Sequence, residues 1–258
     1  MPTAQKPGHA HEPCDDHNVV DAGGVLDDVL ASVRAKKAAG TTPVVVFDLD
    51  HTLFDNGPRT LEILREFARD GGDDVLLGHL SRPVKGIVPY LMSDLLPQIG
   101  ENRPGVMEAA AAYWRDRFFT DDWQRLDVPM PGAAEFAASC FEAGATVVYL
   151  SGRDAPNMLV GCIESLRRFG FPVGLAHTLV VLKPHFDLND FTFKEEVTGF
   201  LATLGEVVAS FDNEPANCNL FARKFPSACT VFLDTAFAPG APSLDPGIPL
   251  ICDFARDA

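Results

Sequence analysis

The sequence predicts an α/β fold in which helices cover both faces of a parallel sheet, giving a three-layer, Rossmann-like core. Two observations carry this prediction. The apolar runs are short and do not alternate with polar residues, as in residues 43–47, which is typical of strands buried on both faces of a parallel sheet. These runs alternate along the chain with segments of helical periodicity, the pattern of successive strand–helix–strand units.

Length and composition agree with a folded protein of this class. The chain has 258 residues, 47% of them hydrophobic and 22% charged, enough for one large domain or for a core that carries an inserted smaller domain. No apolar run approaches the roughly 20 residues needed to cross a bilayer, and the polar start lacks the layout of a signal peptide. We therefore expect a cytoplasmic protein with no membrane partner.

The net charge of -15 argues against a general nucleic-acid-binding protein, because phosphate backbones are held chiefly by clustered Lys and Arg. Residues 1–42 are expected to form a flexible tail followed by one helix. His9, His11 and Cys14 in the tail are possible metal ligands. Nothing around them predicts a rigid frame, and polar termini are usually mobile, so we expect no chemistry there.

A block of helices interrupts the strand series. From residue 59 to residue 123 the periodicity is helical throughout, with Pro and Gly at the breaks. We expect residues 55–124 to form a helical cap inserted after the first strand, and residues 43–54 and 125–258 to form the core.

Strand and helix signals alternate again after the block. Strands are expected over residues 145–150, 178–182, 206–211 and 229–233. Parallel sheets bind ligands beyond the carboxyl ends of their strands. Three of those ends carry polar side chains, namely Asp48 with Asp50, Ser151, and Asp212 with Asn213. We therefore expect the active site at this edge of the sheet.

The segment VVVFDLDHT, residues 44–52, is an apolar strand that runs directly into Asp48-x-Asp50-x-Thr52. It resembles the first motif of the haloacid dehalogenase superfamily, and the resemblance continues to the last strand, with the helical block in the place of the cap. The resemblance implies a Mg²⁺-dependent phosphatase. Asp48 would be the nucleophile that forms an aspartyl phosphate, and Asp50 would protonate the leaving alcohol and then activate water. The alternative is an aspartate pair that caps a turn.

The segment VVYLSGRD, residues 147–154, resembles the second motif of the superfamily. The resemblance implies that Ser151 donates a hydrogen bond to a phosphate oxygen and that Gly152 belongs to the same substrate-binding loop. Arg153 either helps to hold the substrate or braces the loop, and the sequence leaves both roles open. Without this context, Ser-Gly after a strand is more often an ordinary turn.

The third motif requires a lysine near the nucleophile, where its charge lowers the repulsion between carboxylate and phosphate. Lys194 has the spacing to Asp212 that resembles the superfamily pattern, so we favour it over Lys183 as a catalytic and substrate-binding residue. The alternative for Lys194 is an ion pair with Glu195 or Glu196 on a solvated helix face.

The segment VVASFDNEPAN, residues 207–217, resembles the fourth motif, which completes the magnesium site. The resemblance implies that Asp48, the backbone carbonyl of Asp50, Asp212 and waters hold Mg²⁺. Asn213 stands where many relatives have a second aspartate, so the sequence leaves open whether Asp212 or Asn213 is the direct ligand. Glu214 is expected to bind a metal-bound water or Lys194.

These motifs predict a phosphomonoesterase that acts on a small phosphorylated metabolite. One alternative is a 3′-phosphatase of nucleic-acid ends, because SGRD and FDNEP loosely resemble motifs of polynucleotide phosphatases. The others are a non-catalytic or regulatory protein and a phosphonate hydrolase that uses the cap lysine Lys85. The cap residues that could bind a second anionic group of the substrate are Arg59, Arg82, Lys85 and Arg103. The sequence makes no prediction of oligomeric state.

Overall fold

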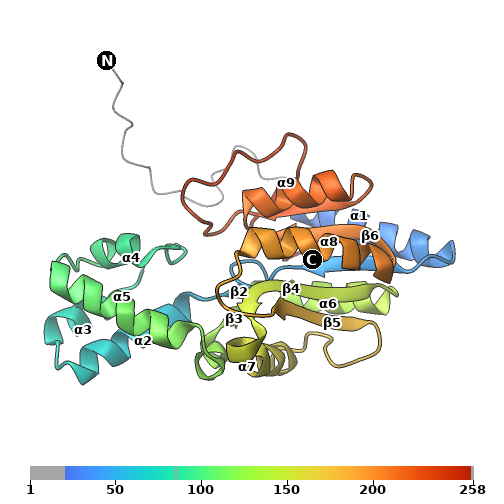
Figure 1. The fold of residues 1–258 in the computed structure, drawn as a ribbon. Coiled ribbons are helices and arrows are strands. Elements are labelled where there is room, and N and C mark those ends of the chain that lie inside the picture. Colours follow the sequence, from blue (N-terminus) through green and yellow to red (C-terminus); the bar gives the residue numbers. More distant parts are fainter. Residues whose placement is uncertain (1–20, 85, 257–258) are drawn as a thin grey trace, which may run out of the picture.

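A computed structural model describes residues 21–84 and 86–256 of the chain. The molecule has a core built around a sheet and a lobe of four helices, α2 to α5, that lies to one side of it (Figure 1). Expectations for the amino-terminal tail and for Lys85 fall outside the described residues.

The core sheet has six strands in the order β5-β4-β1-β6-β7-β8, and all neighbouring strands are parallel. Their bounds are Pro43–Phe47 for β1, Thr146–Asp154 for β4, Thr178–Lys183 for β5, Glu206–Asp212 for β6, Cys229–Leu233 for β7 and Leu250–Ile251 for β8. Strand β1 lies between β4 and β6, so the chain order reverses there. Such a switch point is where open α/β sheets bind ligands.

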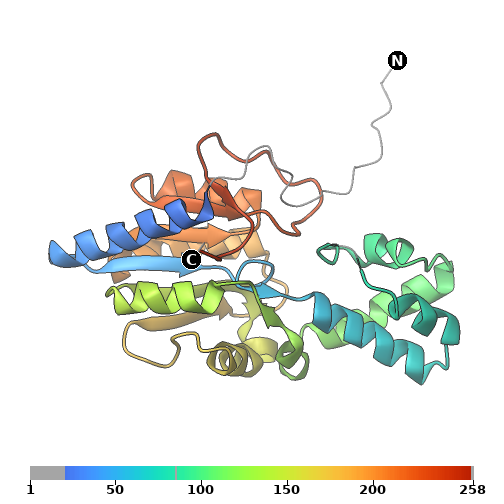
Figure 2. The same ribbon diagram turned by 180° about the vertical axis from the view of Figure 1, so that it is seen from behind.

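Helices cover both faces of the sheet. One face packs against α1 (Ala22–Ala38), α6 (Ala133–Glu142) and α7 (Ala155–Arg168), and Figure 2 shows α1 and α6 in front of the sheet. The other face packs against α8 (Asp190–Leu204) and α9 (Pro215–Lys224). In β1, Val45 and Phe47 point to the first cluster and Val44 and Val46 to the second. Burial on both faces explains why the strand does not alternate, and the predicted three-layer α/β fold is confirmed.

The cap has an apolar core of its own. Its helices are α2 (Gly57–Asp70), α3 (Asp74–Leu80), α4 (Met92–Gln98) and α5 (Pro104–Phe118). Buried side chains from all four helices form one cluster, which includes Leu64, Leu76, Leu95 and Ala110. The cap helices therefore pack mainly against one another, around an apolar cluster separate from those of the core.

Three short elements join the cap to the core. The strand β2 (Phe54–Asp55) pairs antiparallel with β3 (Val128–Pro129), so the outgoing and returning chains lie side by side. The 3₁₀ helix η1 (Asp121–Leu126) packs on α7, where Gly161 N donates to Asp121 Oδ1 at 2.7 Å. A Cβ at Gly161 would lie 2.4 Å from the Asp121 carbonyl oxygen, so this contact requires glycine.

The strands that were expected from unbroken apolar runs are all present, with ends that differ by a few residues. Helix α9, strand β8 and the β2–β3 pair were not predicted. Helix α9 begins at Pro215, within a segment rich in Asn and Pro that resembles a turn, and the other three elements are two residues long. None of the helices in the described part of the chain is long and apolar enough to cross a membrane.

Candidate active site

A cavity of about 770 Å³ lies between the cap and the carboxyl ends of the core strands. We call its core side the floor. Seven of the residues singled out from the sequence line the floor: Asp48, Asp50, Gly152, Arg153, Lys194, Asn213 and Glu214. Ser151 and Asp212 are not part of the cavity surface.

Three charged side chains meet at the floor and just beneath it. Asp48 directly follows β1, where its backbone N–H donates to the Phe211 carbonyl at 2.9 Å, and Asp212 ends the neighbouring strand β6. Lys194, near the start of α8, places its Nζ 2.7 Å from Asp48 Oδ1 and 2.7 Å from Asp212 Oδ2. All three side chains are buried. The predicted nucleophile and the predicted lysine are thus in direct contact.

The charges of this triplet are strongly perturbed. Burial raises the pKa of Asp48, the Asp212 and Asp50 carboxylates raise it further, and Lys194 offsets only part of the rise. Burial opposes the charged form of Lys194, but Asp212 and Asp48 together raise the pKa of its ammonium well above the usual range. Lys194 therefore stays charged, and two carboxylates share one ammonium. A further cation would offset the remaining negative charge.

Asp50 faces arginines instead of Lys194. Arg153 Nη2 donates to Asp50 Oδ1 at 2.6 Å, Asn56 Nδ2 donates to the same oxygen at 2.6 Å, and Arg59 Nη2 lies 3.3 Å away. Although burial alone would raise it, these partners hold the pKa of Asp50 well below its usual range. Asp50 is therefore a carboxylate anion in this arrangement.

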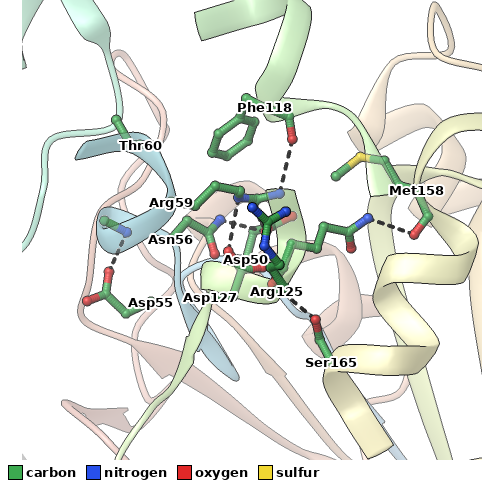
Figure 3. A network of polar contacts seen from close by, with 12 residues as sticks. Asp50, Asp55, Asn56, Arg59, Thr60, Phe118, Arg125, Asp127, Met158 and Ser165 are labelled. Carbon is green, nitrogen blue, oxygen red and sulfur yellow. Dashed lines mark hydrogen bonds and ion pairs between the residues drawn. The ribbon is translucent and has the colours of Figure 1, made fainter. Parts of the chain in front are cut away.

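The two arginines also share a second, fully buried carboxylate. Asp127 lies 3.0 Å from Arg59 Nε and 2.8 Å from Arg153 Nη2, and its side chain is 0% exposed. Phe118 lies over the Arg59 guanidinium, with 3.8 Å between Cζ and the ring centre (Figure 3). We call Asp50, Arg59, Asp127 and Arg153 the hinge network, because its members come from the core, from α2 and from the η1–β3 connection.

The hinge network changes the interpretation of two residues. The sequence suggested Arg59 as a residue that binds a second anionic group of the substrate. Its side chain is 0% exposed and binds Asp127 instead. Of the two roles left open for Arg153, its contacts with Asp50, Asp127 and Gln124 favour bracing. Sequence reasoning missed Asp127 and Gln124, since no motif contains them.

The second-motif loop is tightly packed. Ser151 is 0% exposed, and its Oγ accepts a hydrogen bond from the Arg153 backbone N–H at 3.3 Å. Gly152 lines the cavity, and a Cβ there would lie 2.3 Å from Asp190 Oδ2. The lack of a side chain at Gly152 thus lets the start of α8 approach the loop closely.

Asp212 and Asn213 have different surroundings. Asp212 Oδ1 accepts from Glu214 N at 2.9 Å and from Asn217 Nδ2 at 3.1 Å, while its other oxygen faces Lys194. Asn213 Oδ1 accepts from Thr52 Oγ1 at 3.2 Å, and its amide nitrogen donates to the Ala236 carbonyl. Asn213 therefore ties loops together, and Asp212 is the one aimed toward Asp48.

The donor atoms fit a hard divalent ion. Within residues 21–84 and 86–256, no group of three or more His, Cys, Asp and Glu side chains could hold a metal ion alone. Asp48, Asp212 and the backbone carbonyl of Asp50 would supply two carboxylates and one neutral oxygen. Mg²⁺ typically takes one or two carboxylates and keeps several waters, so this set suits it.

The remaining predicted cations have other partners. Lys183 Nζ donates to the carbonyls of Phe186 and Leu188 and to Asp190 Oδ1, so it braces the loop before α8. In the cap, Arg103 pairs with Glu101 and Asp73, and Arg82 does not line the cavity. Arg115, which the sequence did not single out, is the one cap arginine or lysine of the described chain on the cavity surface.

Solved structures share this fold over most of their length. A candidate phosphatase from Clostridium difficile has a TM-score of 0.54 at 12% identity, covering 82% of this chain and 94% of its own. Protein tyrosine kinase A (PtkA) of Mycobacterium tuberculosis has a TM-score of 0.52 at 16% identity, covering 82% and 94%. A candidate haloacid dehalogenase-like hydrolase from Burkholderia xenovorans LB400 has a TM-score of 0.51 at 15% identity, covering 83% and 93%.

No protein-family model and no curated protein sequence matches the chain. The structural similarity spans more than four fifths of the chain in each of the three cases. The fold that the motifs resemble is therefore confirmed: the chain has the haloacid dehalogenase-like fold.

Proposed function

We propose that this protein is a Mg²⁺-dependent phosphatase that hydrolyses a small phosphomonoester through an aspartyl phosphate on Asp48. The contact between Asp48 and Lys194 carries the proposal. One oxygen of the Asp48 carboxylate is held at 2.7 Å by the ammonium, which leaves the other oxygen for attack at the cavity floor. A carboxylate oriented in this way is suited to nucleophilic catalysis.

In the first step, the free oxygen of Asp48 attacks phosphorus, the bond from phosphorus to the ester oxygen breaks, and the alcohol leaves with a proton. Lys194 remains an ammonium throughout. Its charge lowers the repulsion between the Asp48 carboxylate and the incoming phosphate, and it stabilises charge that develops in the transition state.

Asp50 is the proposed proton donor to the leaving oxygen. In the second step it takes a proton from the water that attacks phosphorus, and the bond from phosphorus to Asp48 breaks, which releases phosphate and restores the carboxylate. Because Arg153 and Asn56 favour its charged form, Asp50 must release at least one of these partners to carry a proton.

Asp48, the backbone carbonyl of Asp50 and Asp212 would hold Mg²⁺, which when bound supplies positive charge beside the phosphate. Asp212 is the better ligand than Asn213, because a carboxylate attracts a hard divalent ion more strongly than a neutral amide does. Gly152 would contact the phosphate at the cavity wall. Ser151, whose hydroxyl was expected to donate to the phosphate, lies just beneath that wall.

The fold alone does not decide the reaction, since one of the similar structures is named a tyrosine kinase. A small substrate is favoured over a nucleic-acid end because the chain carries a net charge of -15.

The proposal is tested by assaying a panel of phosphomonoesters with Mg²⁺, including a 3′-phosphorylated oligonucleotide. Asp48→Asn should abolish turnover while keeping the fold, because the amide has the shape of the carboxylate without its charge. Losing a nucleophile should cost several kcal/mol of barrier, or at least about a thousandfold in rate. Asp27→Asn, on the exposed surface of α1, is the matched control. Retention of more than about a tenth of the activity by Asp48→Asn would refute the assigned nucleophile.

A further inference from the structure

Four of the aromatic side chains that line the cavity contact one another in a row. Trp114 and Phe118 of α5 have ring centres 4.5 Å apart, Phe118 and Phe119 lie 5.0 Å apart, and Phe119 and Phe186 lie 5.1 Å apart. All four residues line the cavity. We call them the aromatic row. It runs from the cap to the loop after β5, so rings from both parts of the molecule form one surface.

Two rings of the aromatic row, Phe118 and Phe186, make cation–π contacts with buried cations. The Arg59 guanidinium lies 3.8 Å from the centre of the Phe118 ring, and Lys183 Nζ lies 5.7 Å from the Phe186 ring. The hinge network and Asp190 hold these cations in turn. Cation–π contacts of this length favour a fixed ring orientation. The row is therefore a preformed surface.

The mouth of the cavity leaves apolar side chains in contact with water. Phe186 is 44% exposed, and Tyr90 and Leu91, on the cap side of the mouth, are 45% and 36% exposed. Exposed apolar groups that gather around a concave site mark a binding surface, whereas scattered ones do not.

Some polar groups that line the cavity are already paired, although Tyr90, Ser93 and Arg115 also line its cap side. The Thr60 hydroxyl accepts a hydrogen bond from Trp114 Nε1 at 3.2 Å, and the Asn56 amide donates to Asp50. On the core side, Asn189 Oδ1 accepts from Thr192 N. A sugar would leave many of its hydroxyl groups unpaired against the aromatic row, which is costly. An aromatic ring needs no such partners.

From this geometry we propose, on the basis of the phosphatase function above, that the substrate is a phosphomonoester whose alcohol carries an aromatic ring. The phosphate lies at Asp48 and Lys194, and the ring lies against the aromatic row. A volume of about 770 Å³ is within the range of sites that enclose one small molecule. Offset or edge-to-face contacts with the row supply the selectivity.

The test compares kcat/KM for benzyl phosphate with that for glycerol 3-phosphate and glucose 6-phosphate. The leaving group of all three substrates is an aliphatic alcohol rather than a phenol. The ratio of kcat/KM for benzyl phosphate to kcat/KM for either of the other two substrates therefore reports chiefly how the alcohol is bound. Wild-type protein should prefer benzyl phosphate by about tenfold or more, the ratio expected for one well-packed ring. Phe186→Ala should lower this ratio several-fold, because it removes the exposed end of the row.

Phe200→Ala is the matched control. Phe200 is also 44% exposed, but it lies on α8 outside the cavity, so the ratio should not change. If the wild type has an equal or higher kcat/KM for glucose 6-phosphate or glycerol 3-phosphate, the aromatic-substrate proposal is overturned and the phosphatase function still stands. The same holds if Phe186→Ala does not lower the preference for benzyl phosphate.

A binding measurement separates the two proposals. Benzylphosphonate and methylphosphonate cannot be hydrolysed in this way, and their affinities with Mg²⁺ are measured by calorimetry on the wild type and on Phe186→Ala. Tighter binding of benzylphosphonate that Phe186→Ala weakens supports the aromatic site, even if no phosphomonoester is hydrolysed and the phosphatase proposal fails. Equal affinities of the two phosphonates for the wild type would overturn the aromatic site.

Discussion

The two oxygens of the Asp212 carboxylate have different partners beneath the floor of the cavity. One of its oxygens binds Lys194, and the other accepts hydrogen bonds from Glu214 N and Asn217. These bonds fix the carboxylate on the side of Asp48. Asn213, although adjacent, directs its amide to Thr52 and Ala236. The two neighbours should therefore respond differently to substitution.

We expect Asp212→Asn to raise the Mg²⁺ concentration required for half-maximal activity by at least about tenfold, because a neutral amide attracts a hard divalent ion less than a carboxylate does. Asn213→Ala should raise the required Mg²⁺ concentration less, because the Asn213 side chain binds Thr52 and the Ala236 carbonyl in neighbouring loops. The measurement is a Mg²⁺ titration of activity for both variants, with circular dichroism to verify that each is folded. A larger effect from Asn213→Ala would reverse the assignment of the ligand.

The residues of the site differ in how well the sequence predicted their surroundings. Asp48, Lys194 and Asp212 come together because each lies in or next to a strand end or helix start that the motifs mark. The hinge network could not be foreseen, because Arg153 meets Asp50 across 103 positions of the chain and Asp127 belongs to no motif. Such pairings depend on how the returning chain from the cap packs, which local patterns do not encode.

At the scale of elements, the hinge network ties α2 of the cap to β4 and to the first motif of the core. Three of its four charged side chains, Arg59, Asp127 and Arg153, are at most 1% exposed, and Asp50 is 31% exposed. Asp127 is the carboxylate that both arginines share. Removing one member of such a group leaves the others without a counter-charge, which costs more than the interaction itself contributes.

Asp127→Asn should therefore lower the free energy of unfolding by about 3–5 kcal/mol, the usual cost of breaking a buried ion pair. Urea denaturation measures this quantity. Asp122→Asn, an exposed residue of the 3₁₀ helix η1 just before Asp127, is the control and should change it by less than about 0.5 kcal/mol. A loss below about 1 kcal/mol for Asp127→Asn would mean that the network adds little to stability.

The elements themselves were predicted to different degrees. Strand β1 was identified at its observed bounds because five consecutive buried positions leave a plain apolar run. The β2–β3 pair and β8 were missed because two-residue strands have no periodicity to detect. Their positions follow from long-range packing.

At the scale of the whole molecule, a helical cap lies to one side of the core (Figure 1). A cavity lies between the cap and the carboxyl ends of the core strands. The sequence predicted the cap from a block of helical segments, separated by Pro and Gly, after the first strand. It did not predict the aromatic row. Trp114 and Phe118 show the spacing of an ordinary buried helix face, and nothing local separates a side chain that packs in a core from one that lines a cavity.

The central claim is that Asp48 receives the phosphoryl group. Beryllofluoride mimics a phosphoryl group bound to aspartate. A crystal structure of the protein with beryllofluoride and Mg²⁺ tests the claim most directly, because it locates the modified atom. The account predicts beryllium bonded to the Asp48 oxygen that Lys194 does not hold, and no such bond in Asp48→Asn. Beryllium bonded to any other residue, or no binding by a protein that hydrolyses phosphomonoesters, would contradict it.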